Sequence, residues 1–242
     1  MSLQSELAEF RSSFMTQVPA EIREAMAHAD LALASSGITQ RALKAGDFAP
    51  DLTLPDARGG TVRLSELLAS GPVVLSFYRG GWCPYCNLEL RALQRALPEI
   101  EVLGASLIAV SPQAPDESLS TAEKNALAFP VLSDAGSSAA KAFGIAFDLA
   151  DELRPIYERF GHALPDRNGD DSWLLPIPAT YVIDRDGSIA LGFVDVDYRN
   201  RLEPEEILNA LRALEARQAS DVKHKRGDCN LLKSALTAHG FW

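Results

Sequence analysis

The feature that most constrains this chain is an apolar run that leads into a pair of closely spaced cysteines. Residues 73–78 (Val-Val-Leu-Ser-Phe-Tyr) are almost continuously apolar, β-branched or aromatic. That pattern is typical of a central strand covered on both faces. Residues 82–86 (Trp-Cys-Pro-Tyr-Cys) follow shortly after, and a helical pattern begins at the first cysteine. The sequence therefore predicts a buried strand, a short loop and a helix that opens with two thiols.

Residues 1–45 predict two helices. An apolar stripe with spacings of three and four marks the first, and residues 19–34 carry a second stripe that ends at residues 35–37 (Ser-Ser-Gly). We expect the pair to pack on its own domain, and an arm for dimerisation or docking is the alternative. The first stripe consists of Leu3, Leu7, Phe10, Phe14 and Val18.

From residue 46 the pattern changes to short strands that alternate with helices, which indicates an α/β three-layer domain. We expect a domain at 46–217, preceded by the helical extension at 1–45 and followed by a tail at 218–242. Strands are predicted at 51–54, 61–64, 73–78, 106–110, 129–132, 179–183 and 189–194. Helices are predicted from 83 to 100, kinked or interrupted at Pro98, and at 118–126, 137–143, 148–160 and 204–217.

Composition excludes several classes of protein. The 242 residues carry a formal net charge of -10, which argues against binding to a phosphate backbone or an anionic membrane. The basic cluster at 223–226 is too small to change that expectation. With 3 Cys, disulfides cannot form the framework. The acidic N-terminus does not resemble a secretory signal and no window predicts a membrane span, so we expect a cytoplasmic protein.

The position of the two thiols predicts their chemistry. The unpaired N–H groups at a helix N-terminus stabilise a thiolate, which is the reactive form of cysteine. Cys83 is thus the expected nucleophile. Cys86 follows one helical turn later on the buried stripe, within reach of a disulfide, and is the expected resolving thiol.

The cysteine pair has two alternative interpretations. A bare Cys-x-x-Cys could be half of a zinc site, but only Cys229 and four His remain, and none forms a spaced pair. The thiols could also be idle, although this spacing between a strand and a helix favours a redox motif. No metal, nucleotide or flavin motif is visible, and we expect no cofactor.

A second signal lies far downstream, where an Ile-Pro dipeptide leads into the predicted strand 179–183. Pro178 is acceptable as the residue that opens a strand. If the bond between Ile177 and Pro178 were cis, the preceding backbone could lie against the thiols.

Four segments together resemble the peroxiredoxin-like branch of the alkyl hydroperoxide reductase/thiol-specific antioxidant family. They are residues 46–54 (GDFAPDLTL), 77–86 (FYRGGWCPYC), 129–134 (FPVLSD) and 177–184 (IPATYVID), and the resemblance covers roughly residues 45–215. It implies a thioredoxin-like three-layer fold in its peroxiredoxin variant. It also implies that Pro178 is a cis-proline facing Cys83.

The chain departs from that family at the site itself. Peroxiredoxins of the main line carry Pro-x-x-x-Thr-x-x-Cys, which places their peroxide-reacting cysteine on Cys86, their threonine on Cys83 and their proline on Arg79. Their catalytic arginine falls on Ser137, so Arg79 is the candidate substitute. Thioredoxins use the first cysteine instead, which is Cys83. Helix-end electrostatics and the expected exposure favour Cys83.

Other residues are open to two interpretations. Trp82 and Tyr85 either flank the site and contact the substrate, or only pack over the helix end. Cys229 could be a further resolving thiol, although an incidental free thiol is the simpler interpretation. His162 and the acidic loop that reaches Asp171 are expected at the solvated surface.

The predicted function is reduction of hydroperoxides by an antioxidant oxidoreductase, in which Cys83 and Cys86 cycle through an internal disulfide. The resemblance implies an external thiol reductant, such as a thioredoxin or glutathione system, and a homodimer is possible. One alternative is a thioredoxin-like protein disulfide reductase without peroxidase activity. A second is a redox sensor or binding module without turnover.

Overall fold

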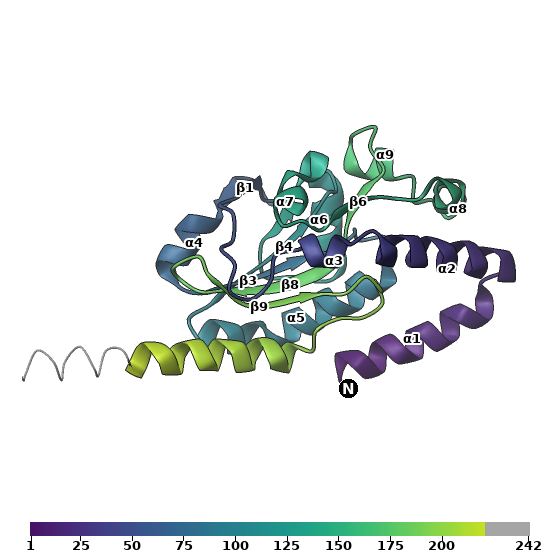
Figure 1. Ribbon diagram of the computed structural model, residues 1–242. Helices are drawn as coiled ribbons and strands as arrows, with labels where there is room; N and C mark the ends of the chain where they lie inside the picture. The colour runs from purple at the N-terminus through teal and green to yellow at the C-terminus, as the bar shows by residue number, and fades with distance from the viewer. Residues whose placement is uncertain (221–242) are drawn as a thin grey trace, which may run out of the picture.

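The centre of the molecule is a five-stranded sheet with the order β5-β4-β3-β8-β9. The structure is a computed structural model, and it describes residues 1–220. Strands β3, β4 and β5 run parallel, whereas β8 is antiparallel to both of its neighbours (Figure 1). The strands are β3 (Val73–Phe77), β4 (Ser106–Ser111), β5 (Val131–Ser133), β8 (Ala179–Ile183) and β9 (Ile189–Val194).

Strand β3 lies between β4 and β8, and all five of its residues are buried. This confirms the central strand that the apolar run predicts. Apolar residues are needed on both faces because helices cover both sides of the sheet. Because β3 is the central strand, the loop that follows it lies at the middle of the end of the sheet where β3 stops.

Two hydrophobic cores lie on opposite faces of the sheet. Helix α5 (Pro84–Val102) and the helix at 204–220 pack on one face, where Leu90, Leu93 and Leu211 are buried. Helices α4 (Leu64–Ser70) and α7 (Ser138–Ala142) lie on the other, as Figure 1 shows. The three-layer thioredoxin-like arrangement predicted from the sequence is confirmed.

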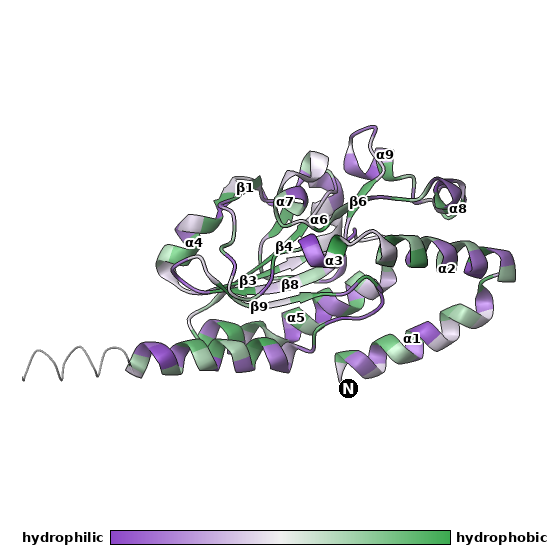
Figure 2. Cartoon of the chain, viewed as in Figure 1, coloured by the Kyte–Doolittle hydropathy of each residue, from purple (hydrophilic) through white to green (hydrophobic). Residues whose placement is uncertain are grey.

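Helices α1 (Leu3–Gln17) and α2 (Ala20–Ser35) precede the sheet, and both carry apolar residues among polar ones (Figure 2). The start of α1 is anchored by the buried side chains of Leu3 and Leu7. Glu6 also pairs with Arg95 of α5 at 2.8 Å. These contacts place the start of α1 against the sheet domain. A short helix, α3 (Ile38–Arg41), then leads to the sheet domain.

Two small hairpins extend from this core. The hairpin of β1 (Thr53–Pro55) and β2 (Thr61–Arg63) confirms one prediction. The pairing of β6 (Ala146–Asp148) with β7 (Leu174–Pro176) was not predicted. This pairing closes a mostly helical segment between the two strands. The segment contains η2 (Asp151–Leu153), α8 (Arg154–Arg159) and α9 (Leu164–Asn168).

Several boundaries differ from the predictions. The helix predicted at 148–160 is wrong at its start, where β6 and η2 take its place. The predicted loop at 164–172 contains α9, because Leu164 is fully buried and anchors a turn there. Helix α6 (Pro115–Lys124) begins before the predicted residue 118, with Pro115 in its first turn. Pro98 does not interrupt α5.

The basic cluster at 223–226 and Cys229 lie outside the described residues. Among residues 1–220, no helix combines the length and the apolar character needed to cross a bilayer.

Candidate active site

The loop between β3 and α5 positions the two thiols. Cys83 is the N-cap residue of α5, and its backbone is extended (φ -84°, ψ 114°). Pro84 then occupies the first helical turn, where a missing N–H costs nothing. Gly80 has φ +148°, and a side chain there would collide with the Trp82 indole. The sequence thus folds locally so that Cys83 meets the positive end of a 19-residue helix.

Buried amide side chains hold this loop in place. The Asn87 side chain donates to the carbonyl oxygens of Gly81 at 2.8 Å and Cys83 at 3.1 Å. The Gly81 N–H donates to the Gln113 side chain at 2.7 Å. Asn125 in turn donates to the Asn87 oxygen at 2.8 Å. The loop backbone is therefore fixed by three separate elements before any substrate arrives.

The two thiols are close to each other and reduced. Their side chains form a hydrogen bond in which Cys83 is the acceptor, and neither takes part in a disulfide. Cys86 is fully buried and Cys83 is only 2% exposed. The expectation that Cys83 is the more exposed thiol holds only narrowly, because α1 and α8 cover the helix end.

The charges around the thiols make them unequal. Burial opposes ionisation of Cys83, but the hydrogen bond from Cys86 and the positive charges of Arg79 and Arg201 outweigh it. Together they lower the pKa of Cys83 to about 6. Burial, and then the adjacent Cys83 thiolate, raise the pKa of Cys86 well above its ordinary value. At neutral pH Cys83 is therefore the thiolate and Cys86 the thiol.

Arg79 is a buried cation enclosed by aromatic rings. Its guanidinium lies 4.2 Å from the ring centroid of Tyr198 and 5.1 Å from that of Trp82, and it donates to the Tyr157 hydroxyl. Within residues 1–220 it forms no ion pair with a carboxylate, and its Nε has no hydrogen-bond partner. An unpaired buried charge is costly, so its natural counter-ion is the Cys83 thiolate.

Arg201 contacts the second thiol, although the two residues are 115 positions apart in the sequence. Its guanidinium donates to the Cys86 sulfur at 3.4 Å and pairs with Glu89 at 2.5 Å. All three side chains are buried. Burial raises the pKa of Glu89 to about 7, although the charge of Arg201 opposes this. Thr180 of β8 adds a hydrogen bond to the same carboxylate at 3.3 Å.

Cys83 opens into a cavity of about 320 Å³, here called the thiol pocket. Its walls come from α1, the loop before α5, α8 and the segment around Tyr198. Cys86 does not line it. The lining residues are Phe10, Phe14, Met26, Arg79, Trp82, Cys83, Pro84, Tyr85, Ile156, Tyr157, Phe160, His162 and Tyr198.

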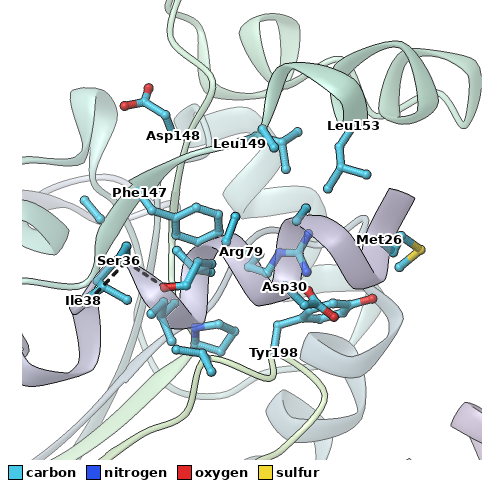
Figure 3. A pocket seen from close by; sticks show the side chains of 18 of the residues that line it. Met26, Asp30, Ser36, Ile38, Arg79, Phe147, Asp148, Leu149, Leu153 and Tyr198 are labelled. Carbon is cyan, nitrogen blue, oxygen red and sulfur yellow. Dashed lines mark hydrogen bonds between the residues drawn. The ribbon is translucent and has the colours of Figure 1, made fainter. Parts of the chain in front are cut away.

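A second cavity of about 430 Å³ lies on the other side of Arg79, between α2 and β6. Figure 3 shows the Arg79 side chain near Asp30 and Tyr198, with Phe147 and Leu149 across from α2. Pro178 lines this second cavity, not the thiol pocket. The peptide bond before Pro178 is trans, so the expected cis-proline facing Cys83 is wrong. The backbone reaches this point from β7, whose pairing with β6 was not predicted.

Residues 45–191 match the family model described as AhpC/TSA family. The chain belongs to this family. Peroxiredoxin Q of Triticum aestivum, a chloroplastic protein, is 31% identical over 173 residues, which cover 72% of this chain and 67% of the relative. The crystal structure of peroxidoxin BcpB from Mycobacterium tuberculosis has 28% sequence identity and a TM-score of 0.56. The aligned region covers 71% of this chain and 98% of the M. tuberculosis chain.

A structure of Xanthomonas campestris peroxiredoxin Q has 22% identity and a TM-score of 0.50, covering 67% of this chain and 90% of that one. At this identity the similarity concerns the fold. The chain is a peroxiredoxin-like member of the thioredoxin superfamily, as the sequence motifs indicated.

The AhpC/TSA motif had placed its reactive cysteine on Cys86 and its catalytic arginine on Ser137. Ser137 is buried, and its hydroxyl has no partner among the described residues. The structure brings Arg79, Trp82 and Tyr85 together around Cys83.

Sequence reasoning missed several contributors to the site. Glu89 and Arg201 form the buried pair beside Cys86, and Phe10 and Phe14 of α1 line the thiol pocket. His162 was expected at the surface, but its ring stacks on Trp82 at 5.1 Å and lines the pocket. A usable signal existed only for Glu89, which lies one turn after Cys86 on the buried face of α5. In the described part of the chain, no three His, Cys, Asp or Glu side chains are grouped to hold a metal ion.

Proposed function

We propose that this thiol-dependent peroxidase attacks hydroperoxides with Cys83 and resolves the product with Cys86. The observation that carries the proposal is the asymmetry of the two thiols. Cys83 lines the thiol pocket and has a pKa of about 6, whereas Cys86 lies behind it and has a raised pKa. The thiolate is the nucleophilic form, so the accessible sulfur is also the reactive one.

In the first step, the Cys83 thiolate attacks the terminal oxygen of the hydroperoxide. An S–O bond forms, the O–O bond breaks, and the alkoxide leaves and takes up a proton to become the alcohol or water. The sulfur is oxidised by two electrons to a sulfenic acid, and the peroxide is reduced by two. Arg79, next to the thiolate, offsets negative charge that moves to the oxygens during this step.

In the second step, Cys86 attacks the Cys83 sulfenic acid. The S–O bond breaks, a disulfide forms, and the hydroxide leaves as water with the proton of Cys86. Oxidation of Cys83 removes the negative charge that raised the pKa of Cys86. The Arg201 guanidinium, 3.4 Å from the Cys86 sulfur, then favours its thiolate. Cys86 therefore becomes easier to ionise only after Cys83 has been oxidised, which sets the order of the two steps.

An external thiol reductant closes the cycle by reducing the disulfide through exchange, either as one dithiol or as two monothiols in succession. We infer a reductant of the thioredoxin or glutathione type, because the disulfide between Cys83 and Cys86 is of the kind that thiol–disulfide exchange reduces. A site that must be reduced again after each turnover suits a reducing compartment, and on that ground we propose the cytoplasm.

The assay that tests this function follows peroxide consumption with a thioredoxin system as the reductant. The expected result is turnover that depends on both peroxide and reductant. A parallel assay of insulin disulfide reduction addresses the alternative activity. Reduction of insulin without peroxide turnover would replace the proposed function by a disulfide reductase. Inactivity in both assays, with a dithiol that can still be oxidised, would indicate a sensor.

The pH dependence of the thiolate provides a quantitative prediction. Because the pKa of Cys83 is lowered to about 6, we expect the ultraviolet absorbance of the thiolate to rise with pH around that value. The rate of sulfenic acid formation should follow the same curve and level off above it. Stopped-flow measurement of both across the acidic range would determine the midpoint.

Arg79→Met should move this midpoint upward, because it removes a positive charge that stabilises the thiolate. Arg212→Met removes an exposed arginine far from the thiols and should leave the midpoint unchanged. An alkaline midpoint in the natural protein, or one that does not respond to Arg79→Met, would contradict this electrostatic account.

A further inference from the structure

The thiol pocket has an apolar wall that comes from outside the family domain. The family match begins at residue 45, whereas Phe10 and Phe14 belong to helix α1. The Phe10 ring packs edge-on against Tyr85 at 5.0 Å and lies 6.0 Å from the Phe14 ring. Met26 of α2 continues the same wall. The two N-terminal helices therefore contribute surface to the pocket into which the Cys83 thiol opens.

The start of α1 is held on the domain by other side chains. Leu3 and Leu7 at the start of the helix are buried in the core, and Glu6 pairs with Arg95. The N–H of Gln4 also donates to Glu203 at 2.7 Å. Phe10 and Phe14 lie further along the helix and are only half-buried. Phe10 packs against the edge of the core, and both rings also line the thiol pocket, where a ligand would meet them.

The lining of the pocket also includes residues with polar atoms that have no partner among the described residues. They are the Arg79 Nε, the Trp82 Nε1, the Tyr85 hydroxyl and the His162 Nδ1, and each is buried. Buried polar groups are nearly always hydrogen-bonded, and the four side chains that carry these atoms all line the thiol pocket, so they add hydrogen-bonding capacity to its wall. Oxygen atoms are the natural partners of the first two, which are N–H donors.

From this arrangement we propose that α1 makes the enzyme selective for hydroperoxides that carry a bulky apolar group. The peroxide oxygens lie near Arg79 and Trp82, next to Cys83, and the apolar group packs against Phe10 and Phe14. A cavity of about 320 Å³ is larger than hydrogen peroxide needs and is suitable for a branched or aromatic organic group. This inference rests on the proposed function, since it names the substrate class of the same site.

The test compares cumene hydroperoxide with hydrogen peroxide in the full-length protein. Phe14→Ala removes part of the apolar wall and should lower kcat/KM for cumene hydroperoxide by about tenfold relative to hydrogen peroxide. Phe14→Trp fills the pocket and should disfavour the bulky substrate as well. Phe48→Ala, at a residue that is 68% exposed and does not line the pocket, is the matched control and should keep the natural ratio.

The ratio of the two kcat/KM values does not depend on how much of a variant is folded, so a loss of stability would not imitate the effect. An unchanged ratio in both Phe14 variants, with turnover of both peroxides retained, would overturn this inference and leave the proposed function intact. Failure of the natural protein to reduce either peroxide would overturn the proposed function itself.

Discussion

Replacing Cys83 by serine is expected to reduce peroxide turnover by at least about a thousandfold, because the hydroxyl does not ionise at neutral pH. Cys83 is the thiol that both lines the pocket and carries the lowered pKa. Its removal takes away the nucleophile, while Cys86 stays fully buried with a raised pKa. Steady-state peroxide consumption with a thioredoxin system measures the loss.

Cys86→Ser is the matched control, since serine keeps a hydroxyl that can donate to the Cys83 thiolate. This variant should consume one equivalent of peroxide and stop at a sulfenic acid on Cys83. A sulfenic-acid trap followed by mass spectrometry would locate the oxidised sulfur. The opposite pattern, with oxidation of Cys86 in Cys83→Ser and no reaction in Cys86→Ser, would return the nucleophile to the position that the family motif predicts.

Breaking the buried pair beside Cys86 should have the largest effect on stability. Arg201→Met leaves the Glu89 carboxylate buried without its counter-ion, which typically costs about 3–5 kcal/mol in the free energy of unfolding. The natural pair is 2.5 Å apart, and both side chains are 2% exposed or less. Urea unfolding of the natural protein and the variant, monitored by far-ultraviolet circular dichroism, would measure the difference.

The cost should depend on pH in a defined direction. Burial already raises the pKa of Glu89 to about 7, and loss of Arg201 removes a charge that lowers it. A carboxyl whose pKa is raised on folding takes up a proton, so its stabilising contribution is lost as pH rises. The variant should therefore lose stability from pH 6 to pH 8 more steeply than the natural protein.

Two further variants make this result interpretable. Arg212→Met removes an arginine that pairs with Glu205 at the surface and should change stability by less than about 0.5 kcal/mol. Adding Glu89→Gln to Arg201→Met removes the buried charge and should restore part of the loss. If Arg201→Met were as stable as the natural protein at pH 8, the pair would not have the role assigned to it.

Much of the sheet domain could be predicted from local patterns. The continuous apolar run at 73–78 specified a central strand, and Pro84 after Cys83 specified the start of α5. The turn residues between β8 and β9 specified their hairpin. Each of these signals involves residues within a few positions of one another, where propensity and hydrogen bonding act directly. The segment 148–172 was predicted less well, because its helices and β6 are stabilised by contacts with α2 and β7.

The sequence by itself determined that two thiols meet a helix N-terminus, since that depends only on their spacing and on Pro84. It could not show that Arg79 is surrounded by aromatic rings near Cys83. Nor could it show that Arg201, more than a hundred residues away in the sequence, contacts Cys86. It also gave no reason to place Phe14 at the same pocket. Charge and apolar surface act over distances in space, so the tertiary structure alone set which side chains lower the pKa of Cys83 and which ones line its pocket.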